Sequence, residues 1–336
     1  MLKLGWKAGP EQYQPNDLLN YVIAAENAGF ESVDISDHFH PWSERGHACF
    51  TWSWLGAAAV KTKNIELGPG VTCPILRYHP AIIAQASATI DNFAPGRTYL
   101  AVGTGEALNE YAATGLWPGY DERQAMMLEA MQLIRALWSG AEVTFEGAYY
   151  STQKARLYTP PVSKLPIYVS SLVPESASFA GRYGDGLMTV ANDPNTLKQI
   201  VKNFEEGARE MGKDPLTMPR LLEVNVAYTD DFDSAARCFR EYWAGAMVPA
   251  MFNERIYTPA MSAQNGSVIG NDILKQRLCI SGDPEAHVKF AQQFIDMGFT
   301  HLYFHSAGPD QRDFIVGYGR DVLPKIRQQQ AQIVTA

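Results

Sequence analysis

The chain has 336 residues, 46% of them hydrophobic and 19% charged, so it is long enough for two ordinary domains or one large α/β barrel. A net charge of −8 and an isoelectric point near 5.4 argue against nucleic-acid binding, which needs a basic face. We expect a soluble protein, because the chain shows neither a signal-peptide core nor a run of about 18 apolar residues. The four cysteines are widely separated and form no C-x-x-C pair, which favours reduced thiols and a cytoplasmic location.

Short apolar segments alternate with helical patterns along nearly the whole chain. Segments rich in Val, Ile, Tyr and Leu are typical of parallel strands that are covered on both faces. The first helical pattern is followed by Gly29, a residue type that commonly ends helices. In chain order, the expected strands are 2–8, 32–36, 65–71, 98–103, 166–171, 185–190, 221–228 and 300–305. The expected helices are 15–28, 79–93, 121–138, 194–211, 231–243 and 283–297.

Eight strands, each followed by a helix or a loop, predict an α/β protein with one (β/α)8 TIM barrel that spans residues 1–336 as a single domain. A doubly wound sheet is the alternative. Its Gly-rich phosphate turn is missing after the first strand, and the GTG after the fourth strand lacks the third glycine. Two stretches are expected as insertions: 142–160 alternates like a hairpin, and 249–276 is long enough to act as a lid.

Polar residues at the C-terminal strand ends are the candidate site residues, because active sites of such barrels lie there. The run SDHFHPW, Ser36 to Trp42, follows the second strand with a carboxylate, two imidazoles and an indole. The run GTGEALNE follows the fourth strand and contributes Glu106. A histidine accepts a proton at neutral pH, and a glutamate in an apolar pocket can have its pKa raised enough to donate one. His38 and Glu106 therefore predict acid–base chemistry, such as deprotonating an alcohol while its carbon gives up a hydride.

Each of these residues also has a purely structural interpretation. His38 could serve as a hydrogen-bonding residue, and Glu106 could favour the dipole of the helix that follows it. His38 and His40 lie on one face of an extended segment, but a metal ion would need a third ligand from elsewhere. We therefore expect no metal site.

Four segments resemble the glucose-6-phosphate dehydrogenase group of coenzyme F420-dependent oxidoreductases, within the bacterial-luciferase-like superfamily. They are SDHFHPW, GTGEALNE, the segment from Arg77 to Arg97 and the segment from His301 to Phe314. The similarity extends over nearly the whole chain. The resemblance implies a luciferase-like TIM barrel, a homodimer, and hydride transfer from a carbinol carbon to C5 of the deazaflavin F420.

The resemblance also implies roles for individual residues. His38 matches the base on the substrate hydroxyl, Trp42 matches a residue that positions the substrate, and Glu106 matches the proton donor near the deazaflavin N1. A cis peptide of the family maps to Gly70-Val71. The expected cofactor-binding residues are Asp37, Gly70, Val71, Thr104, Gly105, Asn109, Ser170 and Ser171. The expected substrate-binding residues are Glu11, at the end of the first strand, Trp243 and Arg277.

The phosphate-binding residues of the sugar-phosphate enzymes are only partly retained. Their arginine maps to Arg277, but their two lysines map to about Asp193 and Asn253, and neither is basic. Arg255 and Lys275 are close enough in sequence to replace them if the loop is shifted.

Other segments resemble the F420-dependent secondary alcohol dehydrogenases of the same group. The segment from Trp243 to Pro259 carries this similarity, and Trp243 matches one of their pocket tryptophans. Their second pocket tryptophan maps near Val226 and is absent. The loop after the fifth strand, Ser170 to Val173, also departs from the small, glycine-rich loop of the family.

The leading hypothesis is an enzyme that oxidises a sugar, with or without a 6-phosphate, or another small alcohol, with coenzyme F420 as hydride acceptor. The alternatives are an F420-dependent secondary alcohol dehydrogenase, an FMN-dependent luciferase-like monooxygenase, and a protein that binds F420 without turnover. The motifs leave the substrate open, because sugar and alcohol enzymes of the group share them.

Overall fold

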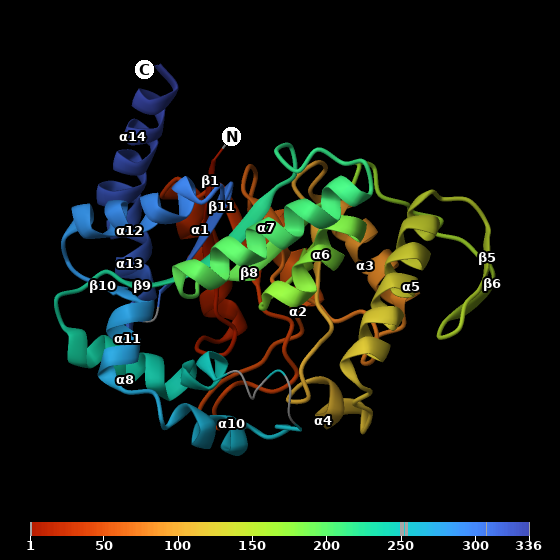
Figure 1. The fold of residues 1–336 in the computed structure, drawn as a ribbon, viewed down its shortest axis with the longest axis horizontal. Helices are drawn as coiled ribbons and strands as arrows, with labels where there is room; N and C mark the ends of the chain where they lie inside the picture. Colours follow the sequence, from red (N-terminus) through yellow and green to blue (C-terminus); the bar gives the residue numbers. More distant parts are fainter. Residues whose placement is uncertain (1, 249–251, 253–254, 307, 336) are drawn as a thin grey trace.

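The computed structural model describes residues 2–248, 252, 255–306 and 308–335 (Figure 1). Within these ranges, eight parallel strands form a barrel in the order β3-β2-β1-β11-β9-β8-β7-β4. Bridges between Leu67 and Thr98 and between Thr72 and Val102 join β3 to β4 and close it. The strands are β1 (Lys3–Ala8), β2 (Ser32–Ile35), β3 (Glu66–Pro69), β4 (Leu100–Val102), β7 (Ile167–Ser170), β8 (Gly186–Val190), β9 (Arg220–Ala227) and β11 (His301–Ser306). The predicted (β/α)8 barrel and all eight predicted strands are confirmed.

The strands alternate between two buried environments. On β1, Leu4 and Trp6 pack under the helices, whereas Gly5 and Lys7 face the barrel interior. Tyr303 fills that interior against Gly5, where a Cβ atom would lie 2.7 Å from the Tyr303 ring. Bulky side chains such as Tyr303 therefore fill the barrel interior below the C-terminal strand ends. The polar residues that face inward at those strand ends can form a site.

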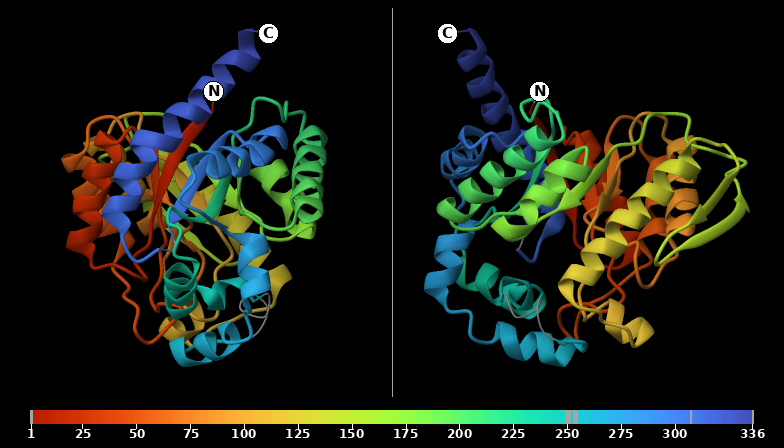
Figure 2. Two further views of the ribbon diagram at one scale, coloured as in Figure 1. Left: turned by 90° about the vertical axis from the view of Figure 1, so that its left-hand side faces the viewer. Right: turned by 45° about the vertical axis from the view of Figure 1, so that its right-hand side comes forward.

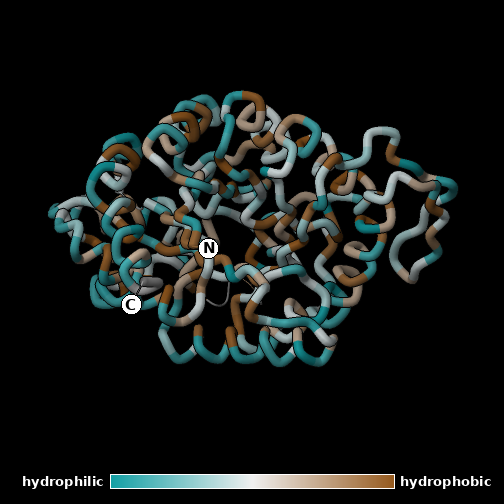
Figure 3. Tube along the Cα trace, turned by 90° about the horizontal axis from the view of Figure 1, so that it is seen from above, coloured by the Kyte–Doolittle hydropathy of each residue, from teal (hydrophilic) through white to brown (hydrophobic). Residues whose placement is uncertain are grey.

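Amphipathic helices cover the barrel, and along the outer helices the chain changes between hydrophobic and hydrophilic residues within each turn (Figure 3). Several begin with proline, whose fixed φ suits the first helical position. All six predicted helices are confirmed. The helices of the outer layer are α1 (Pro15–Asn27), α2 (Thr51–Lys61), α3 (Pro80–Phe93), α5 (Tyr120–Trp138), α6 (Pro174–Tyr183), α7 (Pro194–Glu210), α8 (Phe232–Tyr242), α12 (Pro284–Asp296), α13 (Gln311–Gly317) and α14 (Leu323–Thr335).

The expected hairpin at 142–160 is present as the antiparallel pair β5 (Val143–Glu146) and β6 (Ser151–Ala155). It stands out from the barrel beside α5, while α14 extends from the opposite side (Figures 1 and 2). No helix of the described residues has the length and apolarity needed to cross a membrane.

The second expected insertion, 249–276, lies partly outside the described residues, as does Asn253. Its described part contains α10 (Pro259–Gly266) and most of α11 (Asn271–Arg277), and the short helix η1 (Ala244–Met247) precedes it. These elements gather with α4 (Glu110–Thr114) at one end of the barrel (Figures 1 and 2). The Tyr257 ring packs on Tyr111 of α4, with 5.2 Å between ring centroids. A lid function for this insertion stays a prediction.

Candidate active site

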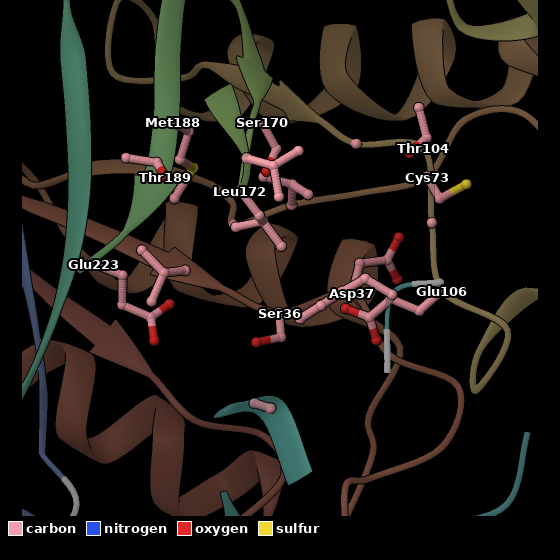
Figure 4. A pocket seen from close by; sticks show the side chains of 18 of the residues that line it. Ser36, Asp37, Cys73, Thr104, Glu106, Ser170, Leu172, Met188, Thr189 and Glu223 are labelled. Atoms are coloured by element: carbon pink, nitrogen blue, oxygen red, sulfur yellow. The ribbon is translucent and has the colours of Figure 1, made fainter. Parts of the chain in front are cut away.

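A cavity of about 400 Å³ opens at the C-terminal ends of the barrel strands. Figure 4 shows side chains from several strands that converge on it. Glu11 and Ser171, two of the expected site residues, are buried behind its wall and do not line it. The expected residues that do line it are Asp37, His38, Trp42, Gly70, Val71, Thr104, Gly105, Glu106, Asn109, Ser170, Trp243 and Arg277.

His38 is held between a carboxylate and an indole. Its Nδ1 lies 2.6 Å from Oε1 of Glu11, whose side chain is fully buried. Its ring meets the Trp42 ring edge to face, with centroids 5.1 Å apart. Burial alone would lower the pKa of His38, but the Glu11 carboxylate outweighs burial and raises it. The structure therefore gives Glu11 the position of a residue that orients His38 and strengthens it as a base.

Glu106 is the second titratable group of the cavity. Burial raises its pKa to about 7, helped by the nearby Glu11 and Glu110 carboxylates and opposed by His38. A carboxyl group with this pKa carries a proton in about half of the molecules at neutral pH, so it can act as a donor. The Asn109 amide donates to Oε2 of Glu106 at 3.3 Å.

Asn109 links Glu106 to the loop that carries His38. Its Oδ1 accepts from the backbone N–H groups of Phe39 at 2.7 Å and His40 at 3.1 Å. The predicted role of Asn109 in holding the cofactor is untested, whereas this bridge between the β2 and β4 loops is visible. It sets the position of the predicted base relative to the predicted acid.

Arg77 also holds together two loops of the site, a role that the sequence motifs did not predict. Its guanidinium donates to the Asp37 carbonyl at 2.6 Å and, through Nε, to Glu110 at 2.9 Å. The Asp37 carboxylate accepts from Thr72 and from Tyr78, the latter at 2.9 Å. Both Arg77 and Glu110 belong to segments that carry the family resemblance, so the signal was present, but no sequence spacing identified them as partners.

The cavity wall next to Glu106 is formed by backbone and apolar groups. The Gly70-Val71 peptide bond is cis, as predicted. Gly105 has a φ of 81°, and a Cβ atom there would lie 2.7 Å from the Cys73 sulfur, so glycine is required. Val71 and Met188 offer apolar surface, and the polar side chains of Thr104, Asn109 and Ser170 border it. Such a wall suits a flat ring with a polar edge.

An arm of the same cavity runs towards the start of α6. Tyr120, Arg123 and Gln124 of α5 line it, together with Val173 and Ser176 of the β7–α6 connection and helix. Arg123 brings a positive charge to this arm, and the start of α6 adds the positive end of the helix dipole. Ser171 stabilises the turn there, because its hydroxyl donates to the Val173 carbonyl at 2.9 Å.

The opposite part of the cavity is mostly aromatic and apolar. Trp42, Phe239, Trp243, Met247 and Phe252 line it. The Trp42 and Phe252 rings lie 6.4 Å apart. This surface suits the carbon skeleton of a small substrate.

Arg277 reaches this part of the cavity, and its guanidinium donates to Oδ1 of Asn192. The neighbouring Asp193 carboxylate is close enough for the Arg277 charge to contribute to lowering its pKa, after the hydrogen bonds from Thr196. Arg255 and Lys275 do not line the cavity; they lie over the rings of Tyr111 and Phe232. In this arrangement, neither cation is therefore placed to replace the missing lysines.

A buried charged cluster lies beneath the aromatic wall. The Lys7 ammonium lies 3.3 Å from both the Asp34 and the Glu223 carboxylates and donates to the Gly70 carbonyl at 2.8 Å. His305 Nδ1 lies 3.1 Å from Glu223. Burial opposes ionisation of Glu223, but Lys7 and His305 outweigh it and lower the pKa, so Glu223 is ionised. Lys7 and His305 lie near the C-terminal ends of β1 and β11, where site residues are expected, whereas Glu223 lies inside an apolar strand pattern that gives no such signal.

The described residues contain no group of three or more His, Cys, Asp and Glu side chains that could hold a metal ion. His40 Nδ1 lies 3.3 Å from the Tyr257 carbonyl instead.

The known proteins that are similar to this chain match it over nearly its whole length. A family model described as luciferase-like monooxygenase matches residues 3–301. An F420-dependent glucose-6-phosphate dehydrogenase of Intrasporangium calvum is 38% identical over 333 residues, which cover 97% of this chain and 99% of that protein. A solved F420-dependent secondary alcohol dehydrogenase in complex with an F420–acetone adduct is 40% identical, with a TM-score of 0.93 over 97% of this chain and 99% of that one. The coenzyme F420-dependent tetrahydromethanopterin reductase of Methanopyrus kandleri is 22% identical, with a TM-score of 0.79 over 97% and 99%, and shares the fold.

Proposed function

The chain belongs to the luciferase-like monooxygenase family, and we propose that it is an oxidoreductase that oxidises an alcohol by hydride transfer to coenzyme F420. The observation that supports this proposal most directly is the pairing of His38, backed by Glu11, with Glu106 in one cavity. A strengthened base and a carboxyl group with a pKa of about 7 match the two proton transfers of such a reaction. The 38% and 40% identical relatives are named for F420-dependent dehydrogenation.

The residues present fit coenzyme F420. The wall of Val71, Met188 and the Gly70-Val71 peptide suits a flat deazaflavin, with Thr104 and Asn109 at its edge. Arg123 and the start of α6 suit an anionic tail on the cofactor. When bound, the coenzyme supplies a two-electron acceptor that takes the hydride at C5. The remaining steps fall to the side chains of this chain.

Oxidation of the alcohol balances with two proton transfers and one hydride transfer. His38 takes the hydroxyl proton, and the electron pair of that O–H bond forms the second carbon–oxygen bond. The carbinol C–H bond breaks at the same time, and its two electrons leave with the hydride. Glu106 would supply the one proton that the bound deazaflavin needs in addition to the hydride. Glu11 stabilises the imidazolium at His38, and Trp42 restricts the position of the reacting carbon.

The substrate that fits best is an alcohol without a phosphate group. Among the described residues, Lys7 and Arg277 bring positive charge to this part of the cavity. Lys7 is held by Asp34 and Glu223, and Arg277 is engaged by Asn192 beside the Asp193 carboxylate. A phosphate there would meet cations that are already partnered, and nearby negative charges. A sugar 6-phosphate is the second candidate, favoured by the position of Arg277 in the cavity wall.

We also propose a homodimer in the cytoplasm. The neighbouring helices α2 and α3 expose Val60, Ile82 and Phe93, which suits a subunit interface. The four free cysteines suit a reducing compartment. Light scattering of the purified chain tests the dimer: a mass of one chain at micromolar concentration rules it out.

Incubation with oxidised F420 and a panel of alcohols, sugars and sugar phosphates tests the function. We expect loss of the absorbance band of oxidised F420 with at least one unphosphorylated alcohol. His38→Ala should lower kcat by about 10²-fold or more, the scale of a general base. His40→Ala is the matched control, because it removes an imidazole two residues away and should change kcat little. Retention of FMN through purification, with no alcohol reducing F420, would mean that the proposal is wrong and that flavin chemistry takes its place.

A further inference from the structure

Two histidine–carboxylate pairs, each packed on a tryptophan, lie in the same half of the cavity. The first is His38 with Glu11 and Trp42, which the proposed reaction uses. The second is His305 with Glu223, 3.1 Å apart, and the Trp243 ring lies 4.1 Å from that of His305. The proposed reaction assigns no role to the second pair, although Glu223 and His305 both line the cavity.

We propose that Glu223 and Asn225 form a subsite for a second hydroxyl group of the substrate, so that the enzyme prefers diols and polyols to alcohols with one hydroxyl. The inference rests on the proposed function, because it assumes that the substrate is oxidised at His38. It assigns to β9 the selection of the substrate and leaves the hydride chemistry to the loops after β2 and β4.

Glu223 has acceptor capacity left over for a ligand. A carboxylate offers about four acceptor positions, and here His305 and Lys7 occupy two of them. The side chain keeps 15% of its surface exposed, whereas Glu11 in the first pair is fully buried. In Figure 4 the Glu223 carboxylate points into the cavity from β9, on the side opposite Glu106. An ionised carboxylate only accepts hydrogen bonds, so its partner must be a donor such as a hydroxyl group.

Asn225 extends the same surface. It follows Glu223 by two residues on β9, so both side chains face the barrel interior, and it stands beside His305 in the register of β9 and β11. The residue is 7% exposed and lines the cavity, yet its amide makes no hydrogen bond to another described residue. A carboxamide both donates and accepts, as a hydroxyl group does, so the two groups are complementary.

A substrate with one hydroxyl group would leave this surface unsatisfied. Its hydroxyl is engaged at His38, and its hydrocarbon part would face the Glu223 carboxylate and the Asn225 amide. Leaving a buried polar group without a partner costs about 1–3 kcal/mol, and more for a charged group. A second hydroxyl group replaces the lost water contacts with direct hydrogen bonds.

The strand order argues that this surface faces the substrate and not the cofactor. The groups that suit the deazaflavin come from β3, β4, β7 and β8, which are neighbours in the barrel. His38, Lys7, His305 and Glu223 come from β2, β1, β11 and β9, which form the other half. Glu223 and Asn225 therefore belong to the half that carries the base.

A comparison of butan-2-ol with butane-2,3-diol and butane-1,3-diol tests the proposal. The wild-type enzyme should show a kcat/KM for at least one diol about 10-fold to 100-fold above that for butan-2-ol, the scale of a hydrogen bond to a charged group. Glu223→Gln keeps the shape but removes the charge, and Asn225→Leu removes the amide with little change in size. Each should lower the diol preference to within about threefold of unity and leave kcat/KM for butan-2-ol less affected.

Gln124→Met is the matched control, because it removes an amide from the cofactor half of the same cavity. It should leave the ratio of diol to mono-alcohol unchanged. Calorimetric titration of the His38→Ala protein with the same compounds gives a readout that needs no turnover: the diol should bind more tightly than butan-2-ol, and Glu223→Gln should remove the difference.

The outcomes separate this inference from the proposed function. If butan-2-ol and both diols reduce F420 equally well in the wild-type enzyme and both variants, the subsite is refuted and the proposed function stands. If Glu223→Gln weakens F420 binding and slows every alcohol alike, the surface holds the cofactor and the inference is refuted. If no alcohol reduces F420, the proposed function fails, and equal binding of diol and mono-alcohol in the titration would then refute the subsite as well.

Discussion

Replacing Glu106 by glutamine should make the protein more stable at neutral and alkaline pH while it removes the proposed proton donor. A pKa of about 7, in place of the ordinary 4.5, corresponds to about 3 kcal/mol at about 1.36 kcal/mol for each pH unit. Glu106 is only partly buried and faces the cavity, so water screens part of this cost. We expect about 1–3 kcal/mol of relative stabilisation in Glu106→Gln.

The pH range of this effect follows from the two pKa values. The unfolded chain releases the Glu106 proton near pH 4.5, whereas the folded protein holds it up to about pH 7. The contribution of the protonated group to stability is therefore complete below pH 4.5 and is lost as the pH rises to 7. Glutamine does not titrate, so the variant should gain on the wild-type protein across this range and keep a constant advantage above it.

Urea denaturation of the wild-type and Glu106→Gln proteins at several pH values from 4.5 to 8 measures the difference. The exposed Glu142→Gln variant controls for the loss of one surface carboxylate. In parallel, turnover of F420 by the variant should fall by about 10²-fold, since glutamine cannot donate a proton of comparable acidity. A stability difference that is the same at pH 4.5 and pH 8, or that shrinks as the pH rises, would refute the reasoning about burial.

Three further predictions concern the groups around the cavity. Glu11→Gln removes the charge beside His38, so kcat should fall by about 10-fold to 100-fold, with an unchanged dissociation constant for F420 in a fluorescence titration. Asn109→Ala removes the link between the His38 loop and Glu106, and we expect a loss of about 10-fold in kcat with normal stability in thermal unfolding. Arg277→Ala should leave KM for unphosphorylated alcohols within about threefold, whereas a rise in KM confined to sugar phosphates would instead support the second candidate substrate.

The eight strands and the main helices could be predicted because each has a strong local signal. A buried parallel strand reads as a short apolar run, and Pro or acidic residues mark the helix starts, as at Pro15 and Pro194. The strand-end rule then placed His38, Trp42 and Glu106 at one rim, and the structure brings them into one cavity. The cis peptide at Gly70-Val71 came from family resemblance alone, because no local pattern encodes it.

Long-range contacts could not be predicted from spacing. The Arg77 guanidinium joins Asp37 and Glu110, which are 40 and 33 residues away, and only the closed barrel brings their loops together. Glu11 was expected to bind substrate, but the turn after β1 carries it behind His38, where its carboxylate meets the imidazole. Glu223 was missed, since a single acid in an apolar strand pattern does not reveal which face it occupies.

The inward position of Glu223 follows from the alternation of side chains along β9. On β9, Leu222 and Val224 pack under the helices, so the alternation of the strand forces Glu223 and Asn225 inward. The same alternation on β1 and β11 places Lys7 and His305 beside them. These positions lie in the half of the barrel that carries the proposed base, and Lys7 joins this half to the opposite wall of β3, β4, β7 and β8 through its hydrogen bond to the Gly70 carbonyl. We therefore expect a substitution on β9 to alter which alcohol is accepted while the residues proposed for proton transfer, which come from the loops after β2 and β4, keep their positions. If so, the loop motifs indicate the chemistry, and the substrate depends on residues outside them.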